Sequence, residues 1–175
     1  MVEITKQNLR NLLEKGYEEF ADSIFRYCYF HTSSREKALD LTQDTFIKAW
    51  EYVAAGQKRK IENLKPFLYM VARNLIIDDR RKKKSDSLDK MRENGFELAS
   101  EESEIIVREN IFEAKLALET IEQLDIKYKE VIILRFVEDM SVKDIARILK
   151  KSENTISVRI HRGIEKLKKI LEEKK

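Results

Sequence analysis

The sequence is poor in the residues that interrupt or cross-link a chain. It has one cysteine, one proline and four glycines among 175 residues. A single cysteine excludes a disulfide scaffold within the chain and suits a reducing compartment. Strands and tight turns need glycine and proline more often than this sequence supplies them. We therefore expect an all-α protein.

Long apolar runs are also missing. No stretch approaches the roughly 20 apolar residues that span a bilayer, and the opening residues, MVEITKQNLR, have no apolar core typical of a signal peptide. We expect a cytoplasmic protein with no membrane insertion. Charged residues make up 38% of the chain, yet the net charge is only +3. Evidence for nucleic-acid binding must therefore come from where the cations lie.

The sequence offers no recognisable catalytic or metal-binding set. Cys28 and His31 are close neighbours, but no second pair of ligands accompanies them, so a buried cysteine within a helix is the favoured interpretation. A phosphate-binding glycine loop, an HExxH motif and a nucleophile–base set are all lacking. We predict a protein that is not an enzyme and has no cofactor and no metal site.

Apolar spacing divides the chain into two helical blocks and a tether. Residues 8–84 and 105–175 carry apolar side chains at the three- and four-residue intervals of helices. Residues 85–104 are polar, contain several serines and lack this period, which is typical of a flexible linker. We predict two small helical domains. Gly16 either separates two helices of the first block or lies inside one.

The first block contains start signals for two further helices. Ser33 or Ser34 is expected to cap one helix, and Pro66 suits the first turn of the next. The expected apolar side of the helix that follows the serines comprises Leu39, Phe46, Ala49, Trp50 and Val53.

The second block has the pattern of a helix-turn-helix. A helix over about 126–137 is broken at EDM, and Ser141 then caps a short helix with Asp144 three residues on. After the turn KKS, Ser152 caps a third helix. The residues expected to face inward are Ile145, Ala146 and Leu149 on the short helix, and Ile156, Ile160, Gly163, Leu167 and Ile170 on the third.

Val158 lies on the polar side of this third helix. An outward valine near the start of a recognition helix is placed to touch a thymine methyl, while Asn154 and Arg162 can hydrogen-bond base edges. Arg159, on one flank, is within reach of a phosphate. A lone surface valine is also common, so the complete pattern, more than Val158, predicts DNA binding. The C-terminal EKLKKILEEKK is interpreted as a solvated charged face.

Three segments in succession carry a more specific signal. ALDLTQDTFIKAWEYV, LKPFLYMVARNLIIDDRRKKK and MSVKDIARILKKSENTISVRIHRGIEKL resemble the signatures of bacterial RNA polymerase sigma factors of the extracytoplasmic-function (ECF) type. The resemblance implies a sigma region-two domain at 8–84, a linker at 85–104 and a region-four domain at 105–175. It also implies the function: to bind core RNA polymerase and direct promoter-specific transcription initiation by recognising −35 and −10 elements and helping to melt the −10 region.

The resemblance implies site residues as well. The residues implied to bind the beta-prime clamp helices of core polymerase are Asp40, Gln43, Asp44, Phe46 and Trp50. Those implied to bind the −10 element are Phe67, Arg73, Asn74, Arg80 and Arg81, with Asn74 facing the pocket for a flipped base. Those implied to read the −35 element are Asn154, Thr155, Ser157, Val158, Arg159, His161 and Arg162. The beta flap of the polymerase and an anti-sigma factor are the other implied partners, besides promoter DNA.

Several alternatives stay open from the residues alone. The chain could be a one-component helix-turn-helix regulator that dimerises and binds a palindrome, although the RRKKK run and the acidic–aromatic segment argue against this. It could also be a helical adaptor without DNA binding, which salt-independent binding would favour. Asp78 and Arg81 match a family pair that could equally be an internal salt bridge. Gly163 stands where the family often has alanine, and its role is open.

Overall fold

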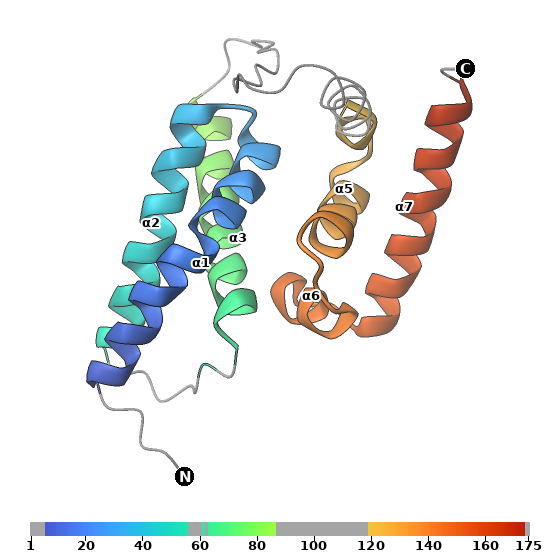
Figure 1. The fold of residues 1–175 in the computed structure, drawn as a ribbon. Coiled ribbons are helices and arrows are strands. Elements are labelled where there is room, and N and C mark those ends of the chain that lie inside the picture. The colour runs from blue at the N-terminus through green and yellow to red at the C-terminus, as the bar shows by residue number, and fades with distance from the viewer. Residues whose placement is uncertain (1–5, 56–60, 62, 87–118, 174–175) are drawn as a thin grey trace, which may run out of the picture. The chain divides into compact units, whose positions relative to one another are not determined.

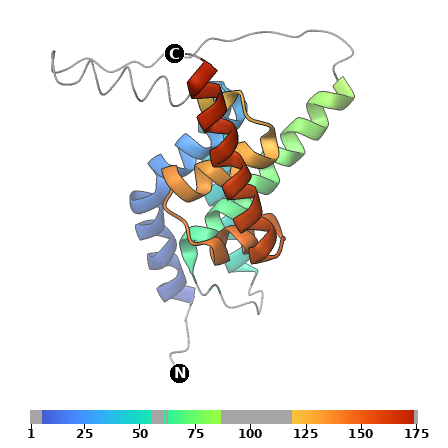
Figure 2. The same cartoon turned by 90° about the vertical axis from the view of Figure 1, so that its right-hand side faces the viewer.

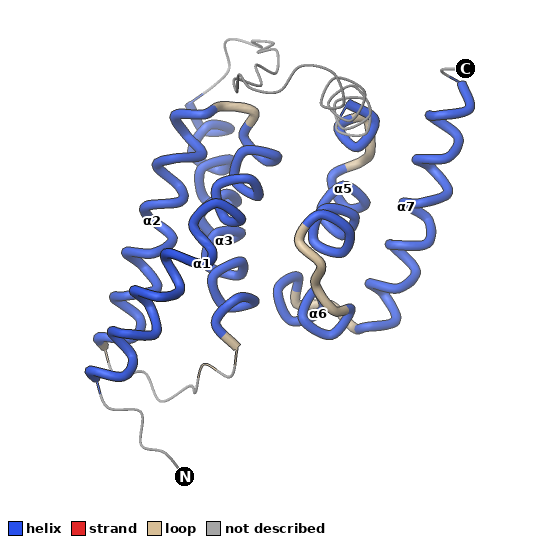
Figure 3. Tube along the Cα trace, in the orientation of Figure 1, coloured by secondary structure: helices blue, strands red, loops and turns tan. Residues whose placement is uncertain are grey.

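The computed structural model describes residues 6–55, 61, 63–86 and 119–173, and the regular structure of these ranges is helical throughout (Figures 1 and 3). The chain divides into two compact units, residues 1–96 and 97–175. The expected all-α class and the two helical domains are confirmed. The expected linker at 85–104 falls largely outside the described residues, so its boundaries stay a prediction.

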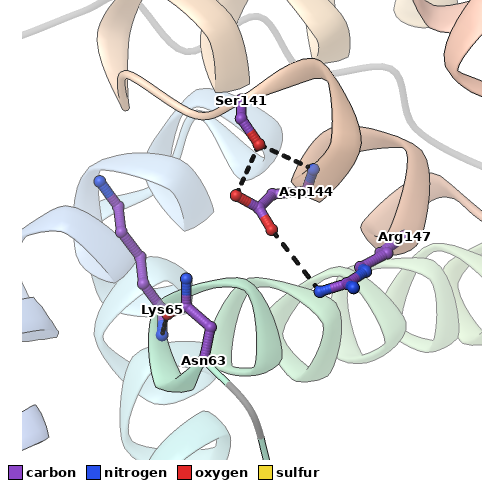
Figure 4. Close-up of polar contacts among 5 residues, drawn as sticks. All are labelled: Asn63, Lys65, Ser141, Asp144 and Arg147. Atoms are coloured by element: carbon purple, nitrogen blue, oxygen red, sulfur yellow. Dashed lines mark hydrogen bonds and ion pairs between the residues drawn. The ribbon is translucent and has the colours of Figure 1, made fainter.

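The first unit contains three helices that pack against one another: α1 (Lys6–Thr32), α2 (Arg35–Ala54) and α3 (Leu64–Asp86). Ser34 caps α2, because its side chain accepts a hydrogen bond from the Lys37 amide at 3.4 Å. Asn63 caps α3 in the same way, because its side-chain oxygen accepts a hydrogen bond from the Lys65 amide at 3.2 Å (Figure 4). Pro66 lies in the first turn of α3, as expected.

Helix α1 runs through Gly16 without a break, so this glycine lies inside one helix and does not separate two. The glycine is buried, and a Cβ atom added there would collide with the side chain of Leu64. Gly16 therefore allows the start of α3 to approach α1 closely.

The centre of the first unit is formed by α1 and α3. Tyr27 of α1 meets Tyr69 of α3 edge to face, with ring centroids 5.1 Å apart, and both are fully buried. Cys28 lies beside them as a core residue, as the sequence predicted. Burial raises the pKa of the Cys28 thiol to about 12, opposed by a hydrogen bond with Thr42. The thiol therefore stays protonated and unreactive at neutral pH.

The buried side of α2 differs from its expected apolar side. Its buried residues are Ala38, Leu41, Thr42, Thr45 and Ala49, whereas Leu39 and Trp50 are 44% and 41% exposed. Small side chains let α2 lie close to its neighbours. The two threonines can be buried because each hydroxyl donates to the carbonyl four residues earlier, at 2.6 Å. The sequence placed Leu39 and Trp50 on the apolar side of this helix without fixing whether that side is buried, and the structure leaves both partly exposed.

The second unit contains α5 (Ile126–Ile132), the π-helical turn η1 (Ile133–Val137), α6 (Val142–Leu149) and α7 (Glu153–Glu173), preceded by helical residues 119–122. The predicted helix over 126–137 thus changes type halfway, and it ends at Val137 as expected. Helix α7 packs against α5 and α6 (Figures 1 and 2). Within the described ranges, no helix has both the length and the apolar character that crossing a membrane requires.

Candidate nucleic-acid interface

The short helix α6 begins with the cap that the sequence predicted. The Ser141 hydroxyl accepts a hydrogen bond from the Asp144 amide at 3.1 Å (Figure 4). The same hydroxyl donates a hydrogen bond to the Asp144 carboxylate at 2.7 Å. The other carboxylate oxygen lies 4.0 Å from the Arg147 guanidinium. These contacts fix the start of α6, and its buried residues, among them Ile145, Ala146 and Leu149, face inward as expected.

The turn between α6 and α7 depends on a left-handed residue. Lys150 has φ 52° and ψ 49°, a conformation that usually favours glycine. The turn is held by the Lys151 amide, which donates to the Ala146 carbonyl at 3.0 Å. Ser152 then caps α7 by accepting from the Thr155 amide at 3.2 Å. α6, this turn and α7 form the predicted helix-turn-helix.

Two residues attach α7 to the core of the second unit. Ile156 is fully buried, and Gly163, two turns later, is buried against α5. A Cβ atom at Gly163 would lie 3.0 Å from Cγ1 and 3.1 Å from Cδ1 of Ile132. Any side chain there would crowd the α5–α7 contact. This answers the question that the sequence left open about Gly163: the glycine permits close packing.

The residues opposite this attachment form an exposed face on the first half of α7. Asn154, Ser157, Val158, His161 and Arg162 are exposed, and Thr155 and Arg159 are half-buried at its margins. Val158 is 41% exposed and so lies outside the core. The Ser157 hydroxyl donates to the Glu153 carbonyl at 3.0 Å, which leaves its oxygen able to accept. His161 lies 3.4 Å from the Glu165 carboxylate. We name these seven residues the reading face.

The −10 candidates on α3 divide between two sides of the helix. Phe67, Asn74 and Arg81 recur at seven-residue intervals and therefore share one side, with Asn74 and Arg81 exposed and Phe67 half-buried. The Phe67 ring leans on Tyr52 of α2 at 5.1 Å between centroids. Asp78 and Arg81 form an exposed ion pair at 4.0 Å within the helix. This side of α3 presents an aromatic ring, an amide and a cation in sequence.

Arg73 and Arg80 lie on other sides of α3. The Arg80 guanidinium donates to the His31 carbonyl at 2.9 Å, at the last turn of α1. An arginine that satisfies a terminal helix carbonyl stabilises that helix end. Arg80 therefore ties α3 to α1, and its part in DNA binding stays a prediction. No signal in the sequence distinguished it from its neighbour Arg81.

A second exposed face lies along α2. Asp40, Gln43 and Asp44 are exposed and Trp50 is 41% exposed, while Phe46 is half-buried against Tyr17 with ring centroids 4.9 Å apart. Sequence reasoning missed two members, since Leu39 and Ile47 are 44% and 55% exposed on the same helix. We name this set the α2 face; its residues are Leu39, Asp40, Gln43, Asp44, Phe46, Ile47 and Trp50.

A smaller apolar patch at η1 was also missed. Phe136 is 58% exposed and Val137 is 37% exposed, on the π-turn that ends α5. In the sequence, the run VIILRFV is too apolar for one face of a helix to bury completely. This excess of apolar residues could have indicated that some of them are exposed. Adjacent exposed apolar residues of this size are typical of protein-binding surfaces.

Comparison with known proteins identifies a family for each unit. The Sigma-70 region 2 family matches residues 17–85, and the Sigma-70, region 4 family matches residues 114–167. The chain is 34% identical over 161 residues to the ECF RNA polymerase sigma factor SigW of Bacillus subtilis (strain 168), covering 87% of this chain and 84% of SigW. It is 27% identical over 160 residues to the RNA polymerase sigma factor SigV of the same organism, covering 91% of each.

Solved structures share the fold. The sigma factor RpoE of Bartonella quintana, solved in complex with the anti-sigma factor NepR, aligns with a TM-score of 0.73 and 23% identity, over 91% of this chain and 96% of that one. CnrH, solved in complex with the cytosolic domain of CnrY, aligns with a TM-score of 0.68 and 18% identity, over 95% and 91% of the two chains.

The packing of Gly163 against Ile132 gives a testable prediction. Gly163→Ala gains up to about 1 kcal/mol in helix propensity, but crowding a packed core costs about 1–3 kcal/mol. We expect net destabilisation of about 1 kcal/mol in urea unfolding of the full chain. Ile132→Val, which removes Cδ1, is expected to make Gly163→Ala less harmful in the double variant. Losses that simply add, or exceed the sum, would contradict the proposed contact.

Proposed function

The chain belongs to the extracytoplasmic-function RNA polymerase sigma factors, and from that premise we propose that it binds core RNA polymerase and directs it to promoters with −35 and −10 elements. The observation that carries the proposal is the presence of both family domains on one chain, and the exposure of the α2 face and the reading face supports it. The one-component regulator is not favoured, because that class of protein has no need for the region-two domain. This role places the protein in the cytoplasm.

The α2 face is the proposed contact with the beta-prime clamp helices. It combines carboxylates and an amide with exposed Leu39, Ile47 and Trp50. A mixed surface with an aromatic anchor is typical of protein interfaces, where aromatic residues contribute much of the binding energy. The buried threonines of α2 support this role, because they leave the larger apolar side chains on the outside.

Phe136 and Val137 are the proposed contact with the beta flap. They are the exposed apolar residues of η1, on the unit that carries the helix-turn-helix. Contacts to the clamp helices through the first unit and to the flap through the second would attach both units to the polymerase. An anti-sigma factor is a further proposed partner, and it would act by covering one or both of these surfaces.

The exposed side of α3 is the proposed −10 site. Asn74 carries both a donor and an acceptor, which suits the pairing edge of a base that has left the helix stack. Phe67 offers a ring on which a base can stack, and Arg81 offers a charge for the backbone. Extruding a base costs only a few kcal/mol. Binding energy at this site is therefore sufficient to help melting, while the polymerase supplies the nucleotide chemistry.

The reading face is the proposed −35 site. The N-terminal residues of a recognition helix contact base edges in the major groove. Arg162 can form two hydrogen bonds with guanine, Asn154 can do so with adenine, and Val158 can contact a thymine methyl. Arg159 at the margin is suited to a phosphate.

We predict that Trp50→Ala weakens binding to core polymerase at least tenfold, because a half-exposed aromatic anchor is lost from the interface. Its free energy of unfolding should also fall, since more than half of the side chain is buried, so urea unfolding must show that the variant is folded under the binding conditions. Titration of labelled full-length protein with core polymerase measures the first quantity. Lys48→Ala, on an exposed margin of the same helix, is the control. Equal affinities for Trp50→Ala and Lys48→Ala would contradict the α2 face as the polymerase contact.

The proposed function predicts new transcription starts. Core polymerase supplied with this chain and genomic DNA should initiate at sites that share −35 and −10 motifs, and these starts should be missing without the chain. Asn74→Ala should lower initiation on duplex promoters. Initiation by this variant should recover on templates whose −10 region is already unpaired. Arg162→Ala should weaken the initial complex on both templates. If no shared motifs emerge while DNA binding remains salt-sensitive, the chain acts as a different kind of regulator.

A further inference from the structure

The ring of Tyr52 lies against Phe67, the aromatic residue of the proposed −10 site. Tyr52 is in the last turn of α2 and Phe67 is in the first turn of α3. The two ring centroids are 5.1 Å apart and the ring planes are inclined at 47°. Aromatic pairs at this separation attract one another beyond the effect of the area they bury. Tyr52 is not among the residues that the resemblance assigned to the site.

The Tyr52–Phe67 pair lies at the surface of the first unit. Both of its side chains are half-buried, whereas Tyr27 and Tyr69, which pair in the core, are fully buried. A pair that served stability alone would gain more from complete burial. The Phe67 ring therefore combines an accessible part with a firm support.

The backbone beneath Phe67 is fixed by other contacts. Asn63 caps the start of α3, and the Leu64 side chain lies against Gly16 of α1. These contacts hold the first turn of the helix, but they do not determine how the phenylalanine ring is turned. The contact with Tyr52 restricts the side-chain rotations of Phe67.

The orientation of this ring matters because Asn74 lies further along the same side of α3. Asn74 follows Phe67 by seven residues, which is a rise of about 10 Å along a helix. Side chains on a helix lean towards its N-terminus, so Asn74 leans towards Phe67. Met70 and Val71, both half-buried, lie between them. A base whose pairing edge reaches the Asn74 amide presents its flat face to the Phe67 ring, so the angle of the ring affects how well the base stacks.

We propose that Tyr52 is a positioning residue for base capture, and that its ring holds Phe67 in the orientation that stacks on the base extruded from the −10 element. The inference rests on the proposed function, because it concerns the same site on α3. Tyr52 acts through Phe67 and needs only its ring for this role, since the contact joins two rings. Helix α2 thus contributes a residue to the −10 site in addition to carrying the α2 face.

Two substitutions separate the ring of Tyr52 from its hydroxyl. Tyr52→Leu removes the ring and keeps an apolar side chain, and it should weaken binding of the single-stranded −10 element about fivefold, the usual strength of an aromatic pair. Tyr52→Phe keeps the ring and should bind as the unaltered protein does. Tyr29→Leu is the matched control, because Tyr29 is a half-buried tyrosine of the same unit that stacks on Phe25 of α1 at 6.1 Å between centroids.

The measurement uses core polymerase assembled with the full chain and a single-stranded oligonucleotide that carries the non-template −10 sequence. Each base of the element is replaced in turn by fluorescent 2-aminopurine, so that the signal reports which base is unstacked and how tightly it is held. Urea unfolding and polymerase affinity of both leucine variants identify any general loss of structure. Tyr52→Leu should have no further effect in the presence of Phe67→Leu, because the two residues act as a unit.

The positioning role would be overturned if Tyr52→Leu bound the −10 strand as tightly as Tyr29→Leu, or if its loss added in full to that of Phe67→Leu. A Tyr52→Phe variant as weak as Tyr52→Leu would also overturn it, because the hydroxyl would then be the group that acts. If Phe67→Leu and Asn74→Ala both leave binding of the −10 strand unchanged, the −10 site of the proposed function fails as a whole.

Discussion

The close contact between Gly163 and Ile132 determines where the reading face lies. Ile156 and Gly163 are the buried residues of α7 in the described part of the chain, and both lie on the side that packs against the rest of the unit. The glycine brings α7 close to α5, and the capped turn at Ser152 fixes its first residue. Because the start of α7 and its contact with α5 are both fixed, Val158 and Arg162 must lie on the outer side of the helix. The residues of the reading face therefore owe their position to packing on the opposite side of the helix.

In the first unit, α2 likewise has a buried side that packs and an exposed side that does not. Its inner side is made of alanine, leucine and threonine, and the threonine hydroxyls are satisfied within the helix. This inner side contains no large aromatic residue, and Trp50 and Ile47 are partly exposed on the other side. On α3, Tyr69 is buried at the centre of the unit while Asn74, five residues later, is exposed. In both units the core and the proposed binding surface occupy different sides of the same helices.

Much of this arrangement could be predicted from the sequence, and the failures have physical causes. Ser141 and Ser152 were identified because capping depends on local sequence. The two-domain organisation and the reading face followed from periodicity and from the resemblance of three motifs. The small-residue inner side of α2 could not be predicted, because hydrophobicity does not reveal how closely two helices approach. The π-turn at η1 and the Arg80–His31 contact were missed because both depend on tertiary packing that local patterns do not encode.

The account rests most directly on α7 reading bases through its exposed side. Selection of active promoters from a library with randomised −35 positions would test this with the unaltered protein, Val158→Ala and Leu171→Ala, the last being a similarly exposed apolar residue near the end of α7. We predict that Val158→Ala loses the preference for thymine at one −35 position and keeps the others, because a single methyl contact is removed. Leu171→Ala should keep the full motif. An unchanged motif for Val158→Ala would contradict the account.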